Sequence, residues 1–364
     1  MKRKFTALIL VATLTMTMLV GCGNSSSPDS KGTSDSPSPA TSSDGAPITI
    51  RLSATMGTNH QLTMSAEEFA KYVNENSGGA INVEVYPSAQ LYNDENMTEA
   101  IPEGFVEMGL CQTANWAGYV PSAEYFTLSG YFDDYDWFKR CCAGEPGQYV
   151  IKDVEDTMGV KILSLFNYGI CEMVSTKELK TPEDFQGTKM RMLGISEGLY
   201  CQALGGAPVS ISAAENYEGL QKGTIDGVST GPSSVISRKL YEVAHYVTLN
   251  TMLKETKYFL MVNGDFWNSL SAENQALLQE AADYAYEYNA TASAKSDTDA
   301  VAALEAMDNV TVDYWTPEQQ KAIQDVVLPV VLENFKGMVG DETYNFLMDA
   351  SEALIPEEWP CPTR

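Results

Sequence analysis

Residues 271–307 read SAENQALLQEAADYAYEYNATASAKSDTDAVAALEAM. The stretch contains many alanines and neither glycine nor proline, so nothing in it interrupts a helix. A helix over the whole stretch spans roughly 55 Å at about 1.5 Å per residue, which exceeds the width of one small domain. We therefore expect one long helix that lies across two lobes.

Two runs of alternating strands and helices precede this helix. In the first run we expect strands at 48–52, 81–86 and 106–111 and helices at 60–76 and 93–103. In the second run we expect strands at 160–166, 173–175, 189–193, 208–211 and 224–228 and helices at 197–204, 214–222 and 231–244. This order is typical of α/β units with a largely parallel sheet. A strand at 310–314 follows the long helix, and the capping box at Thr316 starts a last helical section.

The predicted architecture is a pair of α/β lobes with a central cleft, joined by more than one crossover. We assign residues 48–168 and about 248–290 to the first lobe. Residues 169–247 and about 291–355 form the second lobe.

Composition excludes several classes of function. The chain carries 23 basic and 49 acidic residues, a formal charge of −26, which repels nucleic acid. Its seven cysteines include no Cys-x-x-Cys pair and only two histidines accompany them, so zinc-type spacing is absent. We expect no metal and no cofactor. With Cys22 set aside, the six remaining cysteines are either free thiols or disulfides.

The N-terminus has the parts of a secretory signal. Lys2, Arg3 and Lys4 precede an apolar stretch at 5–20 that is short for a transmembrane span. The stretch ends Leu19-Val20-Gly21-Cys22, which resembles a bacterial lipobox and implies removal of residues 1–21 and lipidation of Cys22. Residues 22–47 are a disordered tether rich in Ser, Pro and Gly. The alternative is a plain signal peptide with an incidental cysteine. We expect a body held outside the cytoplasm by its lipid anchor.

One motif in the sequence is typical of an enzyme. Gly227-Val228-Ser229-Thr230-Gly231 matches the G-x-S-x-G elbow of serine hydrolases. The histidine that such a triad needs would have to be His245, which lies within or just past the helix that follows. A secreted serine esterase using Ser229 therefore remains an alternative, and a non-enzymatic role is our expectation.

Arg191 ends a short predicted strand and has apolar neighbours. Clefts in α/β sheets form at strand ends. A guanidinium there needs a partner, and the fork of a carboxylate suits it. The residues alone leave two partners open, a ligand carboxylate or an acidic side chain of the protein.

Several stretches, in order, resemble the solute-binding subunits of TRAP transporters, the DctP family, over nearly the whole mature chain. They are 81–91, 101–108, Asp184-Phe185-Gln186-Gly187-Thr188-Lys189-Met190-Arg191, 203–209, 215–227 and 266–282. The resemblance implies a periplasmic-binding-protein-like fold with a long helix bracing both lobes. It implies that Arg191 binds the carboxylate of a small organic acid, which is then delivered to TRAP membrane subunits. An ABC-transporter solute receptor is the alternative of the same type.

The remaining site candidates follow strands or match the family's Glu-x-Tyr. They are Asn59, His60, Gln112, Thr113, Asn115 and Trp116 in the first lobe and Cys171, Glu215, Tyr217 and Thr230 in the second. Trp116 either stacks on a ligand ring or lies in the core. The chain departs from the family at Cys171, where many members carry a second arginine, and at 228–231, which replaces Glu-Asn-Pro. Because the arginine is missing, we expect a monocarboxylate.

Overall fold

The computed structural model describes residues 47–356. The signal segment, the tether, Cys22 and Cys361 lie outside the described residues. None of the helices within the described range combines the length and the apolar character that crossing a bilayer requires.

The described strands form one mixed sheet in the order β2-β1-β3-β9-β4-β7-β5-β6, with β8 paired to β4 and β10 paired to β8. Their bounds are β1 Ile48–Ala54, β2 Ile81–Tyr86, β3 Met108–Gln112, β4 Val160–Ser175, β5 Lys189–Arg191, β6 Ala207–Val209, β7 Gly227–Thr230, β8 Tyr246–Leu249, β9 Lys254–Asn263 and β10 Thr311–Tyr314. The outer pairs β1–β2, β1–β3, β5–β6 and β5–β7 are parallel, as predicted.

The centre of the sheet is antiparallel, so the prediction of a largely parallel sheet was wrong there. β9 runs antiparallel to both β3 and β4. Neither β8 nor β9 was predicted. Residues 256–262 of β9 are all buried, so this strand lacks the alternation of apolar and polar residues that identifies a half-buried strand.

β4 joins the two halves of the sheet. Its 16 residues contain both strands predicted at 160–166 and 173–175. Residues up to Cys171 pair with β9, and Glu172–Ser175 pair with β7. The register shifts between Asn167 and Gly169, where Gly169 has φ 122°. A Cβ there would lie 2.2 Å from the Oδ2 atom of Asp297, so both the backbone and the packing require glycine.

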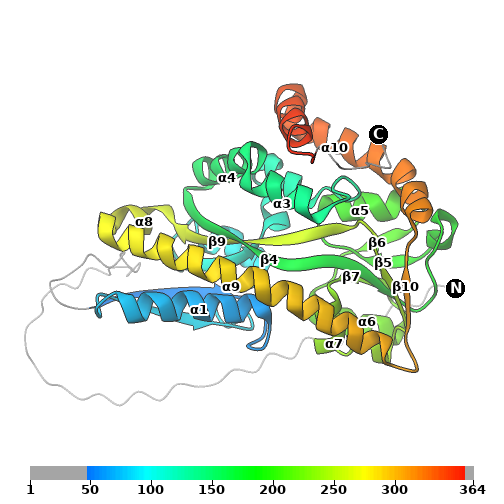
Figure 1. The fold of residues 1–364 in the computed structure, drawn as a ribbon, viewed down its shortest axis with the longest axis horizontal. Coiled ribbons are helices and arrows are strands. Elements are labelled where there is room, and N and C mark those ends of the chain that lie inside the picture. Colours follow the sequence, from blue (N-terminus) through cyan, green and yellow to red (C-terminus); the bar gives the residue numbers. More distant parts are fainter. Residues whose placement is uncertain (1–46, 357–364) are drawn as a thin grey trace, which may run out of the picture. The chain divides into compact units, whose positions relative to one another are not determined.

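The long helix is confirmed. α9 covers Ala272–Glu305, 34 residues, which at ~1.5 Å per residue is ~51 Å. It begins after Ser271, whose hydroxyl accepts the Asn274 N–H. Figure 1 shows α9 crossing the sheet, alongside α1 (Gln61–Asn76) at one end and α7 (Pro232–Ser237) at the other.

The other helices are shorter, except the last. They are α2 Asp94–Ala100, α3 Tyr135–Ala143, α4 Glu145–Met158, α5 Gly194–Ala203, α6 Asn216–Lys222, α8 Gly264–Ser269 and α10 Pro317–Glu352, with 3-10 turns η1 Thr113–Trp116, η2 Pro121–Thr127, η3 Pro182–Phe185, η4 Ala213–Glu215 and η5 Leu240–Glu242. α7 ends well before the predicted residue 244 because Lys239 adopts a left-handed backbone, φ 55°.

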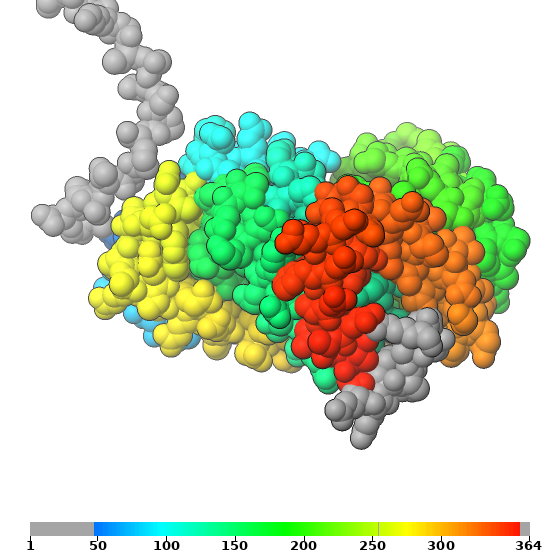
Figure 2. Space-filling model, turned by 90° about the horizontal axis from the view of Figure 1, so that it is seen from above, coloured from blue at the N-terminus to red at the C-terminus, as the bar shows by residue number. Residues whose placement is uncertain are grey.

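α10 connects segments that are far apart in the sequence. Its first turn has the predicted capping box at Thr316, and its helical path is interrupted at Gly340. Near its end, Ser351 accepts the indole N–H of Trp137 at 2.8 Å and contacts the Tyr125 hydroxyl at 2.6 Å. Figure 2 shows α10, coloured orange to red, lying over this part of the chain. The lobe boundaries stay a prediction.

The cysteines of the described residues are dispersed along the chain and buried. Cys111, Cys141, Cys142, Cys171 and Cys201 are all buried and none is in a disulfide. Burial raises the pKa of the Cys201 thiol to about 12, so this thiol stays protonated and acts as a small apolar group.

A buried polar network fixes α9 to β4 at the register shift. Asn289 of α9 is fully buried; its Oδ1 accepts the Asn167 N–H at 2.5 Å and its Nδ2 donates to the Asn167 carbonyl at 3.1 Å. The Asn167 side chain accepts from Lys257, whose ammonium also pairs with Glu255 at 2.6 Å. Burial lowers the pKa of Lys257, but Glu255 outweighs it and keeps the ammonium charged.

We predict that Asn289→Ala destabilises the fold strongly, because it leaves the buried N–H and C=O of Asn167 without partners. Each such group costs about 1–3 kcal/mol, so we expect the free energy of unfolding to fall by about 2–4 kcal/mol in urea titrations. Glu287→Ala, at an exposed position of the same helix, should change it by less than about 0.5 kcal/mol. Equal effects of the two substitutions would contradict the role of Asn289.

Candidate ligand-binding site

Arg191 is a buried cation at the end of β5. Its side chain is 3% exposed. Nε donates to the Ile211 carbonyl and Nη1 donates to the Ser229 carbonyl, both at 3.2 Å. Burial lowers the pKa of this guanidinium, and the Glu197 carboxylate offsets part of that effect. A guanidinium has five N–H donors, so most of them remain available for another acceptor.

Acidic side chains of the described chain do not take up these donors. Within residues 47–356 Arg191 forms no ion pair. The carboxylate that acts on it, Glu197, accepts instead from the Leu193 N–H at 2.6 Å and the Ser229 hydroxyl at 3.0 Å. The sequence left two partners open for Arg191, a ligand carboxylate or an acidic side chain of the protein. Among residues 47–356, the structure places no acidic side chain in ion-pair contact with it.

Tyr168 of β4 organises the neighbouring polar groups. Its hydroxyl lies 3.2 Å from the Thr230 hydroxyl and 2.6 Å from the Ser234 hydroxyl. Its ring stacks on His60, with 5.3 Å between ring centroids. The Tyr168 carbonyl accepts from the Gln61 side chain at 2.7 Å. Tyr168 thus connects the start of α1 to the end of β7, and sequence analysis missed it because a single tyrosine in a strand carries no motif.

His60 is a neutral donor in this cluster. Its Nδ1 accepts the Leu62 N–H at 3.2 Å and caps α1, so the proton lies on Nε2. Within residues 47–356 the buried Nε2 atom has no hydrogen-bond partner. Burial, and then the charge of Arg238, lower the pKa of the imidazole to about 3.

The other first-lobe candidates differ in burial. The buried Thr113 hydroxyl has no hydrogen-bond partner in the described chain. Gln112 donates its backbone N–H to Asp94 at 3.4 Å. Trp116 is fully buried within the hydrophobic core, which favours the core alternative for this residue. Asn59 is exposed and Asn115 is half-buried.

In the second lobe, only part of the predicted set lies near Arg191. The Cys171 sulfur lies 3.1 Å from the Thr256 hydroxyl, and Cys171 is among the groups that act on the pKa of Arg191. Glu215 is exposed and closes the capping box at Ser212. The Tyr217 hydroxyl donates to the exposed Glu242 at 3.0 Å. The contact of Glu215 thus lies within its own turn, and that of Tyr217 joins α6 to η5. A part for these two residues in binding stays a prediction.

The serine-esterase alternative lacks its geometry. The Ser229 hydroxyl donates to Glu197. The His245 ring is exposed and its Nδ1 contacts the Tyr241 carbonyl at 3.1 Å. Neither of the chain's two histidines is hydrogen-bonded to Ser229, so the structure contains no serine–histidine pair at this motif.

Comparison with known proteins settles the family. Residues 52–337 match the model of DctP, the bacterial extracellular solute-binding proteins of family 7. The chain belongs to this family. It is a binding protein and not an enzyme, as the sequence predicted.

Individual relatives of the DctP family cover most of the chain. The chain is 31% identical over 290 residues to the C4-dicarboxylate-binding periplasmic protein DctP of Rhodobacter capsulatus, covering 78% of this chain and 85% of the relative. It is 29% identical to the DctP of Shewanella loihica, covering 85% and 90%. The solved structure of a TRAP periplasmic solute-binding protein from Sulfurospirillum deleyianum, with bound succinate, superposes with a TM-score of 0.77 at 26% identity, covering 84% of this chain and 100% of that one. These matches confirm the predicted fold class.

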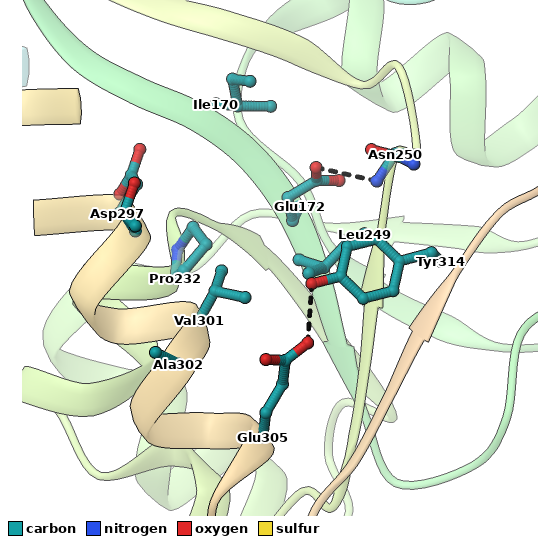
Figure 3. Close-up of a pocket in the computed structure, with 11 residues that line it drawn as sticks. Ile170, Glu172, Pro232, Leu249, Asn250, Asp297, Val301, Ala302, Glu305 and Tyr314 are labelled. Carbon is teal, nitrogen blue, oxygen red and sulfur yellow. Dashed lines mark hydrogen bonds between the residues drawn. The ribbon is translucent and has the colours of Figure 1, made fainter. Parts of the chain in front are cut away.

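A separate pocket of about 400 Å³ lies on the α9 side of β4 in this DctP-family chain (Figure 3). It is lined by Ile170, Glu172, Pro232, Leu249, Asn250, Asp297, Thr298, Val301, Ala302, Glu305 and Tyr314. Glu172 accepts the N–H groups of Asn250 and Thr251, each at 3.0 Å. Burial raises the pKa of Glu172 and of Asp297 to about 7 each. Another acidic side chain also contributes to raising each of these two pKa values.

Asp297 makes the stability depend on pH. Its ordinary pKa is 3.8 and its native pKa about 7, so folding takes up a proton between these values. The free energy of unfolding therefore falls as the pH rises from about 4 to about 7 and stays lowered above that. We predict that the stability of Asp297→Asn relative to the unsubstituted protein increases by about 2–3 kcal/mol between about pH 5 and about pH 8.

Thermal unfolding at the two pH values measures this difference. The matched control is Asp299→Asn, an exposed carboxylate on the same helix that pairs with Lys295. Its effect should be small and equal at both pH values. A pH-independent effect of Asp297→Asn would show that the native carboxyl titrates in its ordinary range.

Proposed function

We propose that this chain captures a small organic acid and that Arg191 binds the acid's carboxylate. The observation that carries the proposal is a guanidinium that is 3% exposed, donates to two backbone carbonyls and forms no ion pair within the described residues. An uncompensated buried charge is costly, and a bidentate ligand carboxylate removes that cost.

The names of relatives support this chemistry. The R. capsulatus and S. loihica proteins are C4-dicarboxylate-binding proteins, and the S. deleyianum structure holds succinate. These ligands carry carboxylates, which fits a site built around an arginine.

Further hydrogen-bond donors complete the proposed site. His60 Nε2 and the Thr113 hydroxyl are buried and have no partner within residues 47–356, and the Thr230 hydroxyl belongs to the Tyr168 cluster. We assign these groups to the body of the ligand. The proposal keeps the rest of the predicted set as secondary contacts: Asn59, Gln112, Asn115, Trp116, Cys171, Glu215 and Tyr217.

The proposed physiological role is delivery of the acid to the membrane subunits of a TRAP transporter, from a body tethered outside the cytoplasm through lipid on Cys22. The support for the tether is the run Leu19-Val20-Gly21-Cys22 after a basic start and an apolar stretch. Two acyl chains give stable attachment where one gives only marginal attachment.

We predict that Arg191→Ala weakens binding by roughly 30-fold or more, because removal of one partner of a desolvated charge pair costs about 2–5 kcal/mol. Arg191→Lys should also bind poorly, since an ammonium lacks the two-pronged geometry. Calorimetry with the tightest acid from a thermal-shift panel of mono- and dicarboxylates measures both. Arg140→Ala removes an exposed arginine and should leave affinity unchanged. A folded Arg191→Ala protein with full affinity would overturn the proposal.

For the anchor, we predict that Cys22→Ala abolishes incorporation of a labelled fatty acid and releases the protein from membranes. Cys361→Ala, which removes a cysteine at the other end of the chain, should keep the label. Membrane-bound, labelled Cys22→Ala protein would show that the cysteine at the lipobox is incidental.

A further inference from the structure

The pocket on the α9 side of β4 has the size and the apolar surface of a ligand site. Its volume of about 400 Å³ lies within the roughly 300–1,000 Å³ that is usual for pockets that hold small molecules. Its 11 lining residues come from β4, β10, α7, α9 and the segment between β8 and β9, and none of them belongs to the set predicted for the site around Arg191. The pocket is therefore a separate candidate for a bound molecule.

Two large apolar side chains that line this pocket are exposed. Ile170 in the second half of β4 is 42% exposed, and Tyr314 at the end of β10 is 46% exposed. The Tyr314 hydroxyl donates to Glu305 at 2.9 Å, which holds the ring at the pocket wall (Figure 3). Exposed apolar surface gathered at one pocket is typical of a place that a ligand covers. The lining thus fits a ligand whose body is apolar or aromatic.

Two carboxyls line the same pocket, and neither forms an ion pair with a described side chain. Glu172 is 7% exposed, and it is held in place by the N–H groups of Asn250 and Thr251 and by the Thr251 hydroxyl at 2.6 Å. The Oδ1 atom of Asp297 is buried and has no hydrogen-bond partner within residues 47–356. Asp297 therefore presents a free acceptor in an apolar pocket.

The two carboxyls place negative charge at the pocket wall without a cation to balance it. Burial raises the pKa of each to about 7, and Asp297 contributes to raising the pKa of Glu172. The Ser233 hydroxyl and the Ile170 N–H contribute to lowering the pKa of Asp297, but burial outweighs them. At about pH 8 most of both carboxyls are ionised, and a cation that enters the pocket offsets the cost of burying their charge.

We propose that this pocket binds an organic cation, a primary amine with an apolar body. The ammonium group donates to Asp297, and its charge also offsets that of Glu172. The body packs on Ile170 and Leu249, and an aromatic body also stacks on the Tyr314 ring. A metal ion would leave this apolar wall open, so the lining favours an organic cation.

Calorimetry at about pH 8 tests the proposal with two pairs of ligands that share a body: benzylamine with benzyl alcohol, and phenethylamine with phenethyl alcohol. In the better pair the amine should bind the unsubstituted protein at least about tenfold more tightly than its alcohol. Asp297→Asn keeps the shape of the side chain and removes its charge. It should weaken binding of the amine about tenfold or more and change binding of the alcohol less than about twofold. If neither amine binds more tightly than its alcohol, the inference is wrong.

Asp299→Asn is the matched control for charge. Asp299 is an exposed carboxylate on the same helix and pairs with Lys295, so this substitution should change the affinity for the amine less than about twofold. Equal weakening by Asp297→Asn and Asp299→Asn would show that the amine responds to the general charge of α9, and it would overturn the proposal.

A second pair of substitutions tests the pocket by its shape and serves if Asp297→Asn does not fold. Ala302 lines the pocket and is exposed, so Ala302→Phe fills part of the space with little effect on the core and should abolish binding of the amine. Ala303→Phe changes the next residue, which is also exposed and does not line the pocket, and should leave binding unchanged. Full affinity for the amine in Ala302→Phe would contradict the assignment.

Arg191→Ala separates this site from the one proposed for the organic acid. The substitution should leave the affinity for the amine within about twofold, because Arg191 does not line the pocket. Loss of amine binding in the folded Arg191→Ala protein would place the amine in the site around Arg191, and the inference would be wrong. Failure of the acid to bind there would overturn the proposed function alone, since the amine site does not depend on it.

Discussion

The fold depends on how one strand and one helix are held together where they cross both halves of the molecule. β4 changes partners from β9 to β7 and β8 within a few residues, and Asn289 of α9 binds the backbone of Asn167 immediately before that change. Gly169 allows the close approach of Asp297 at the same place. Because these groups are buried, the crossing is defined by hydrogen bonds that water cannot replace.

The buried positive charge of Arg191 contrasts with the negative net charge of the whole chain. The protein carries an excess of 26 negative charges, and most of its ion pairs lie on exposed surfaces. Arg191 is buried near Glu197 without pairing with it, since that carboxylate is held by Ser229 and Leu193. The Glu197 carboxylate therefore stabilises the charge of Arg191 and leaves the guanidinium N–H donors available. The negative net charge also discourages binding of unrelated anions elsewhere on the surface.

The order of residue types along the chain predicted much of this structure. A strand buried on both faces was missed. The uninterrupted alanine-rich stretch predicted α9 within two residues at each end, and the capping residue at Thr316 predicted the start of α10. β9 was missed because its middle is buried on both faces. Arg191 was identified because it ends a strand in a recognisable run. Tyr168 and Ser234 were not, since each joins the site through contacts between segments that are distant in the sequence.

His60 caps α1 through its Nδ1 atom, and this hydrogen bond determines that the ring proton lies on Nε2. With Nδ1 occupied by the Leu62 N–H, the imidazole is held as the tautomer whose proton lies on the buried Nε2 atom. Its pKa of about 3 keeps it uncharged near neutral pH. In the proposed site, the imidazole offers the solute one directed N–H donor and no positive charge. In the proposed site, titration of this imidazole therefore adds no pH dependence to ligand binding above about pH 5.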